Sequence, residues 1–102
     1  MSPRTEKPRR CRCTFRGTGY RPVGVPACGE RVPLHRDELE ALRLCDGEGL
    51  TQSAAGARMG VSRGTVQRIL AAARNKVATA LACGRALVFE RRPGRRNERR
   101  TR

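Results

Sequence analysis

Apolar residues recur at helical spacing in three stretches after residue 35, and this pattern predicts three helices. We expect them at residues 36–46, 52–59 and 63–82. The first helix has an inward face of Leu39, Leu42 and Cys45. The third is the longest, and its apolar stripe comprises Val66, Ile69, Leu70, Ala73, Val77, Ala80 and Leu81. The fold class is therefore expected to be mainly α.

Extended structure is expected only at the two edges of this helical region. Residues 13–34 contain seven glycines and prolines, which exclude a helix there. We expect short extended pieces in this segment, packing on the helices through Phe15, Tyr20, Val23 and Val25. Residues 86–90 form a short β-prone run, which is predicted to pair with the region around residues 15–25.

Arginine is concentrated at the two ends of a chain whose formal charge is +14. Residues 1–12 carry five basic and one acidic side chain, and residues 91–102 carry seven arginines and one glutamate. We therefore predict a disordered basic arm at 1–12, one folded domain at 13–90 and a disordered arginine-rich tail at 91–102. Both ends are expected to contact phosphate without sequence preference.

Residues 50–70 have the signature of a helix-turn-helix motif, which lays its second helix in the DNA major groove. Thr51 and Ser62 are good N-caps for the two helices. Small residues at 54–57 let the helices cross closely, and Gly60 stands where the turn needs a positive φ. Val61 is expected to plug the turn into the core.

The polar face of the third helix and the start of the second supply the candidate DNA contacts. Gln67 suits adenine and Arg68 suits guanine by donor–acceptor geometry. Residues 49–89 contain no acidic side chain, as expected of a phosphate-binding surface. The predicted DNA-binding residues are Thr51, Gln52, Arg58, Ser62, Arg63, Thr65, Gln67 and Arg68.

One group of residues has some resemblance to a metal site. Cys11, Cys13, Cys28 and His35 follow a C-x-C…C…H order, which departs from the usual zinc spacing. Unliganded thiols are the favoured interpretation, so no cofactor is expected. Zinc or an iron–sulfur cluster, in a metal- or redox-responsive regulator, is the alternative. The single histidine and the lack of a nucleophile pattern predict that the protein is not an enzyme.

The chain resembles uncharacterised protein family 0251, the domain of unknown function numbered 134. The resemblance covers residues 7–90, and its most specific parts are the runs Asp37-Glu38-Leu39-Glu40-Ala41-Leu42-Arg43-Leu44 and Met59-Gly60-Val61-Ser62. Because the core of that family looks like region 4 of sigma factors, the resemblance implies a helix-turn-helix fold and DNA binding. Region 4 also docks on RNA polymerase, so a polymerase accessory factor is the second hypothesis, with the acidic residues 37–48 as the docking face.

The expected partner is double-stranded DNA, bound by a homodimer at paired half-sites. The second half of the third helix and the strand at 86–90 are the expected dimer surfaces. No apolar stretch is long enough to span a bilayer, and the N-terminus has no apolar signal segment. We therefore expect no membrane partner and a cytoplasmic, nucleoid-associated location.

Overall fold

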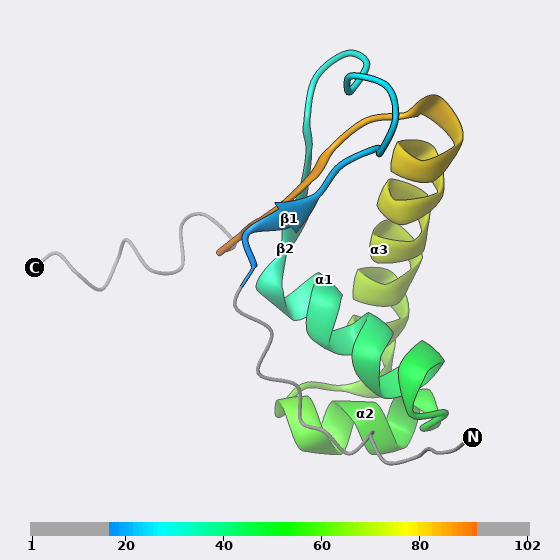
Figure 1. Cartoon of the computed structure of the whole chain (residues 1–102). Helices are drawn as coiled ribbons and strands as arrows, with labels where there is room; N and C mark the ends of the chain where they lie inside the picture. Colours follow the sequence, from blue (N-terminus) through cyan, green and yellow to red (C-terminus); the bar gives the residue numbers. More distant parts are fainter. Residues whose placement is uncertain (1–16, 92–102) are drawn as a thin grey trace, which may run out of the picture.

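The computed structural model describes residues 17–91, in which three α-helices pack with a small three-stranded sheet (Figure 1). This confirms a mainly helical domain with short extended segments. Phe15, the arm at 1–12 and residues 92–102 lie outside the described residues. The elements in chain order are β1 (Gly19–Tyr20), β2 (Val32–His35), α1 (Arg36–Ala41), the π-helical segment η2 (Leu42–Gly47), α2 (Gln52–Met59), α3 (Arg63–Cys83) and β3 (Leu87–Glu90).

Local capping interactions set the bounds of α2 and α3, as the sequence predicts. The Thr51 hydroxyl accepts from the Ala54 N–H at 3.0 Å, and the Ser62 hydroxyl accepts from the Thr65 N–H at 3.1 Å. Gly60 ends α2 in the left-handed conformation with φ 77°, and Gly84 ends α3 with φ 72°. These are the positions where a residue without Cβ is least strained.

The sheet has the order β1-β3-β2, with β3 antiparallel to β1 and parallel to β2. The pairing of β3 with the segment around β1 is confirmed, and β2 is a further strand, at the end of the segment expected to be extended but at residues that the sequence did not single out. Its alternation is visible in the structure, since Val32 and Leu34 are buried while Pro33 is exposed. Proline is tolerated here because β2 lies at an edge of the sheet.

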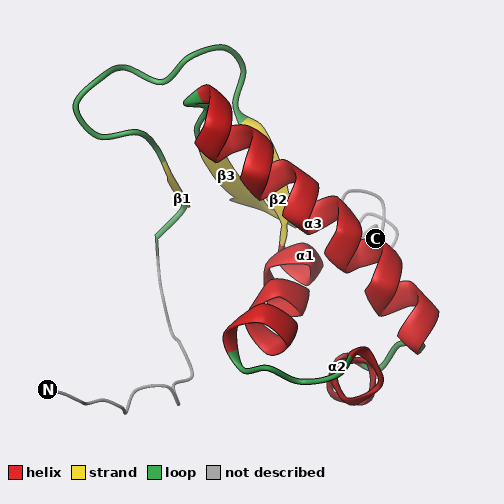
Figure 2. Ribbon diagram, turned by 90° about the vertical axis from the view of Figure 1, so that its right-hand side faces the viewer, coloured by secondary structure: helices red, strands yellow, loops and turns green. Residues whose placement is uncertain are grey.

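The expectation that Val23 and Val25 pack on the helices is wrong. Their side chains are exposed, and the segment between β1 and β2 forms a loop beside the C-terminal end of α3 (Figure 2). The Cys28 N–H holds this loop by donating to the Gly84 carbonyl at 2.8 Å. The helices have no room for the two valines because β2 and β3 already cover the apolar face of α3.

Two core clusters lie along α3. The first joins α3 to the sheet, and the second joins α3 to η2 and α2. Buried members of the first are Val32, Leu34, Ala73, Ala80 and Leu87, with Leu39, Leu42, Val77 and Phe89 packed against them. Buried members of the second are Leu44, Ala55 and Val66, with Cys45, Leu50 and Met59 packed against them. Leu81 was expected in the apolar stripe but is exposed. Its side chain projects from a part of the helix circumference that the sheet does not cover.

The predicted inward residues of the first helix do pack against the core, but the most deeply buried side chains are two others. Ala41 and Leu44 are fully buried, whereas Leu39 and Leu42 are half-buried against the first cluster and Cys45 is half-buried against the second. The helix widens after Ala41, and the Glu48 N–H donates to the Arg43 carbonyl five residues earlier. This π-type turn changes the angular step between residues, so the faces after residue 41 do not follow an α-helical projection.

A buried carboxylate connects α1, β2 and α3. Glu38 is only 2% exposed. Its Oε1 accepts from the His35 N–H and from the Lys76 ammonium, both at 2.8 Å. The first bond satisfies a backbone donor at the start of α1, and the second provides the positive charge that a buried carboxylate requires.

The crossing of α2 and the turn before α3 depends on Gly56. A Cβ atom at this position would lie 2.6 Å from the Val61 carbonyl oxygen and 3.4 Å from Val66 Cγ2. The Val61 N–H also donates to the Gly56 carbonyl at 2.9 Å. The backbone of Val61 thus packs on α2 while its side chain points outward, 37% exposed, so the expected plugging of the core by Val61 is wrong.

Among the helices within residues 17–91, none has the length and apolar character needed to cross a membrane.

Gly56→Ala should destabilise the domain although alanine is the better helix former. The added methyl group must displace the turn backbone, and such overpacking costs about 1–3 kcal/mol. The free energy of unfolding in urea measures the effect. Gly64→Ala is the matched control, because a Cβ there would meet only Arg68 Nη1 at 3.9 Å. If both variants were at least as stable as the wild type, the close crossing would be refuted.

Candidate nucleic-acid interface

The first two turns of α3 carry a chain of hydrogen-bonded polar side chains on their outer surface. The Ser62 and Thr65 hydroxyl oxygens lie 3.0 Å apart, and Arg68 Nη2 donates to Thr65 Oγ1 at 3.4 Å. All three residues are spaced by three positions, which puts them on one helix face. Ser62 therefore caps the helix and contacts Thr65, which in turn contacts Arg68.

Arg68 extends back toward the N-terminus of α3. Its Nη1 lies 3.9 Å from the position that a Cβ on Gly64 would occupy. The N-terminal end of a helix carries a partial positive charge, which repels a cation. Arg68 is held near that end without a carboxylate partner among residues 17–91. The combination of guanidinium and helix N-terminus forms a concentrated positive potential.

Arg63 and Gln67 complete the exposed face of these turns. Both side chains are exposed, and neither has a hydrogen bond or ion pair with another side chain in the described region. The structure therefore brings together five of the predicted residues on one helix: Ser62, Arg63, Thr65, Gln67 and Arg68. Ser62, Arg63, Gln67 and Arg68 are exposed, and Thr65 is half-buried.

The three predicted residues of α2 have different environments. Thr51 uses its hydroxyl as the N-cap, and Gln52 is half-buried in the first turn. Arg58 lies in the last turn of α2, where Nη2 is 3.8 Å from Glu48 Oε1. That ion pair is long and exposed, so it holds Arg58 weakly.

The acidic segment at 37–48 is largely engaged within the domain. Arg43 pairs with Glu40 at 2.8 Å and with Glu48 at 2.7 Å. Asp46 accepts two hydrogen bonds from Arg74 of α3, at 2.7 and 3.1 Å. These contacts, with the buried Glu38, mean that the segment offers little unpaired negative charge.

The Asp46–Arg74 pair joins η2 to the middle of α3, and sequence reasoning missed it. The hydrogen bond from Arg74 lowers the pKa of Asp46 from its ordinary value of 3.8. The same bond raises the pKa of Arg74. The two residues are 28 positions apart, so no local spacing rule indicates the contact. The charge of Arg74 is consequently paired within the domain, although its side chain is exposed.

The proposed metal residues are only partly within the described region. Cys11 and Cys13 lie outside it. Cys28 is exposed in the loop after β1, and His35 is the N-cap residue of α1. Between residues 17 and 91, no group of three or more His, Cys, Asp or Glu side chains is placed to hold a metal ion.

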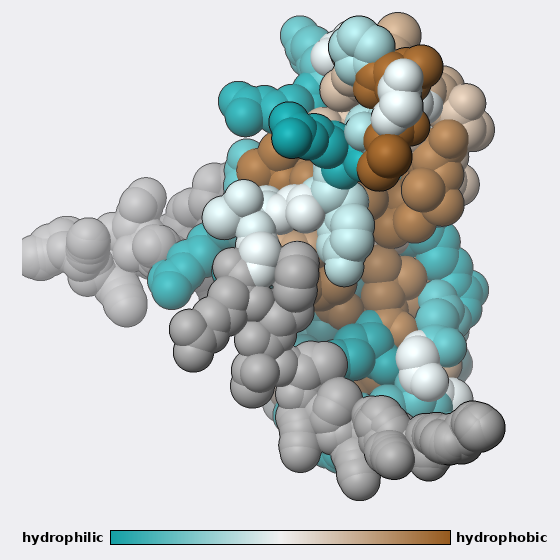
Figure 3. Space-filling model, in the orientation of Figure 1, coloured by the Kyte–Doolittle hydropathy of each residue, from teal (hydrophilic) through white to brown (hydrophobic). Residues whose placement is uncertain are grey.

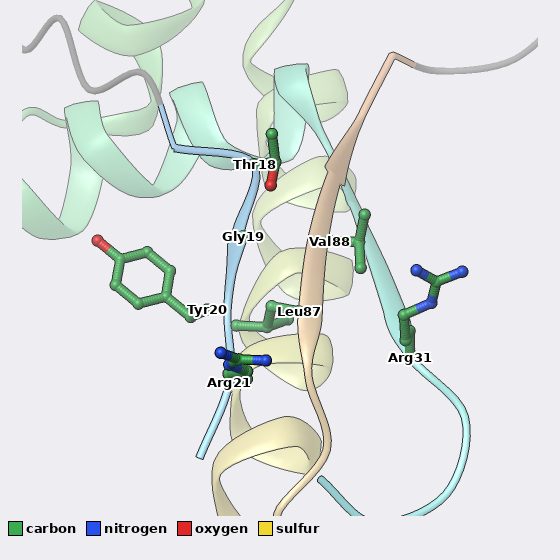
Figure 4. Close-up of a pocket in the computed structure, with 7 residues that line it drawn as sticks. All are labelled: Thr18, Gly19, Tyr20, Arg21, Arg31, Leu87 and Val88. Carbon is green, nitrogen blue, oxygen red and sulfur yellow. The ribbon is translucent and has the colours of Figure 1, made fainter. Parts of the chain in front are cut away.

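A shallow hollow of about 350 Å³ lies over β1 and β3 (Figure 4). Its lining includes Gly19, Leu87 and Val88, with Arg21 and Arg31 on opposite sides of β3, while the ring of Tyr20 points away. The two guanidinium groups do not converge on one point in this view. The hollow is on the sheet, which packs along the C-terminal half of α3, so it is separate from the exposed turns around Arg68 (Figure 1).

Comparisons with known proteins identify relatives across most of the chain. The family described as "Protein of unknown function DUF134" matches residues 1–95. A UPF0251 protein of Desulforudis audaxviator is 47% identical over 92 residues, covering 82% of this chain and 58% of its own length. One from Vibrio vulnificus is 46% identical over 88 residues, covering 85% and 88%, and one from Thermococcus kodakarensis is 65% identical over 72 residues, covering 69% and 64%. No solved structure matches the chain.

Asp46→Asn should remove a small, pH-dependent contribution to stability. Because the pKa of Asp46 is lowered in the folded state, the pair stabilises the fold above the ordinary value of 3.8 and loses this effect as the pH falls through the folded-state pKa. We expect the wild type to be slightly more stable at neutral pH and the difference to vanish in acid. Urea unfolding across a pH series measures it.

The matched control is Glu30→Gln, which removes a carboxylate with no ion pair in the described region. Added salt should reduce the difference at Asp46, because the pair is exposed. A difference that grew toward acidic pH would contradict the assigned ion pair.

Proposed function

The chain belongs to the DUF134 family of proteins of unknown function, and we propose that it binds double-stranded DNA as a sequence-specific transcriptional regulator. In this proposal α2, the Gly60 turn and α3 act as a helix-turn-helix motif, and the first turns of α3 enter the major groove. The observation that supports it most is the exposed set Arg63, Gln67 and Arg68, which has no acidic partner among residues 17–91.

Each side chain has a chemical role in the proposed complex. Arg68 can offer two donors to the O6 and N7 acceptors of guanine, and Gln67 can pair with the N6 and N7 edge of adenine. Arg63 begins α3, whose free backbone N–H groups favour a phosphate. Ser62 and Thr65 support Arg68 through their hydroxyl groups.

The second helix is proposed to contact the DNA backbone. Thr51, Gln52 and Arg58 would supply these contacts, which fix the register but carry no base information. Arg58 can exchange its weak pairing with Glu48 for a phosphate oxygen. The arginines of segments 1–12 and 91–102 add attraction to phosphate in any sequence.

The other hypotheses have less support. Docking on RNA polymerase through the acidic segment would need free carboxylates, whereas Glu40, Asp46 and Glu48 are each paired with an arginine of the domain. A metal- or redox-responsive regulator depends on Cys11 and Cys13, which lie outside the described residues. We propose a binding protein rather than an enzyme, and the cytoplasmic nucleoid as its location.

Selection from a random duplex pool tests the proposal directly. The full chain should enrich one sequence motif that survives near-physiological salt, because base contacts depend less on counterion release than phosphate contacts do. Sequencing of the bound DNA across a salt series measures it. Binding without enrichment that disappears as salt rises would reduce the function to charge attraction and would refute a sequence-specific regulator.

Arg68→Ala should relax specificity at one base position of that motif, at a cost of about 1–3 kcal/mol. Affinities for the selected site and for its single-base variants measure this change. Arg36→Ala is the matched control, since Arg36 is exposed at the start of α1, away from α3's first turns. If Arg68→Ala weakened all sequences equally, Arg68 would contact phosphate instead of a base.

A further inference from the structure

The end of the molecule opposite α2 exposes large apolar side chains. Val23 is 96% exposed, Val25 is 63% exposed and Leu81 is 76% exposed. The loop and the end of α3 are joined by the bond from the Cys28 N–H to the Gly84 carbonyl. In the space-filling view, hydrophobic residues lie on the right-hand side of this end and continue toward the middle of the molecule, with hydrophilic residues on its left-hand side (Figure 3). We call Val23, Val25 and Leu81, together with the segments 22–29 and 77–84 that contain them, the apolar end.

The apolar end is also free of charge. Residues 22–29 and 77–84 contain no charged side chain, in a chain whose net charge is +14. Arg21, Glu30, Lys76 and Arg85 flank these runs, and Arg85 donates to the Glu30 carbonyl at 2.7 Å, across the base of the loop. The surface is therefore an uncharged island whose rim carries three cations and one carboxylate.

We infer that the apolar end is the surface through which two copies of this chain associate. Two copies carry the same net positive charge and repel each other over most of their surfaces. Contact between uncharged islands removes apolar area from water while keeping the charged regions apart. A two-fold arrangement is self-complementary, since the same patch serves both copies. Nucleic acid would instead select the arginine-rich surfaces.

This location is compatible with DNA binding but does not depend on it. The 21 residues of α3 extend about 31 Å, so the apolar end is far from the turns that carry Arg63 and Arg68. Both copies would keep those turns free. The strand expected at 86–90 is a poorer dimer surface, because β3 is central and both its edges are paired.

Sedimentation equilibrium of the full chain tests the inference, in reducing buffer without DNA. We expect a monomer–dimer equilibrium in the micromolar range that strengthens as salt is raised, because salt screens the net positive charges of the two copies from each other. Leu81→Glu should weaken association about tenfold or more, because a charge must then be buried in an apolar interface. Val23→Asp should have the same effect.

Val61→Glu is the matched control, because Val61 is exposed in the turn after α2, outside the apolar end. Its dimer should equal that of the wild type. A wild-type chain that stays monomeric at several hundred micromolar would overturn the inference, as would dimers unaffected by both Leu81→Glu and Val23→Asp. Because DNA is absent, these results are separate from those of the duplex selection.

Discussion

The buried carboxylate of Glu38 is the interaction on which the arrangement of the domain depends. It receives a backbone N–H from the end of β2 and the ammonium of Lys76 from the middle of α3. A carboxylate this deeply buried is costly unless both bonds are made. The position of α1 relative to α3 is thereby fixed at one point. The apolar contacts provide most of the favourable burial, while Glu38 selects the geometry.

The long helix α3 has three different environments along its length. Its first turns are exposed and cationic around Arg68 on their outer side, while Val66 enters the second core cluster and Ala73 the first. Its last turns carry the exposed Leu81 beside the uncharged loop. A single rigid element thus separates a charged surface from an apolar one by most of the length of the domain.

The sequence was most informative where structure is determined by neighbours along the chain. Thr51, Ser62, Gly60 and Gly84 act through bonds within four residues, so the bounds of α2 and α3 could be predicted closely. Features that depend on distant partners could not. The strand β2 forms only because β3 is available beside it, although the two are more than fifty positions apart.

In the candidate site, too, features set by neighbours along the chain could be predicted and features set by distant partners could not. The exposed face of α3 follows from helical periodicity, and the spacing of Ser62, Thr65 and Arg68 could have indicated their hydrogen-bonded chain. The pairing of Arg74 with Asp46 could not be predicted, because only the tertiary fold brings the two residues together. Nor could the π-type turn after Ala41, which changes the buried face of that helix.

The central place of β3 has a consequence for the order in which the domain can form during synthesis. The strands β1 and β2 pair only with β3 in the described sheet, and β3 is the last of its elements in the chain. A ribosome extends the chain from the N-terminus, so α2 and α3 can form their local bonds while the sheet still lacks its middle strand. The sheet can therefore be completed only after residues 87–90 emerge, when all the helices of the described region have already been synthesised.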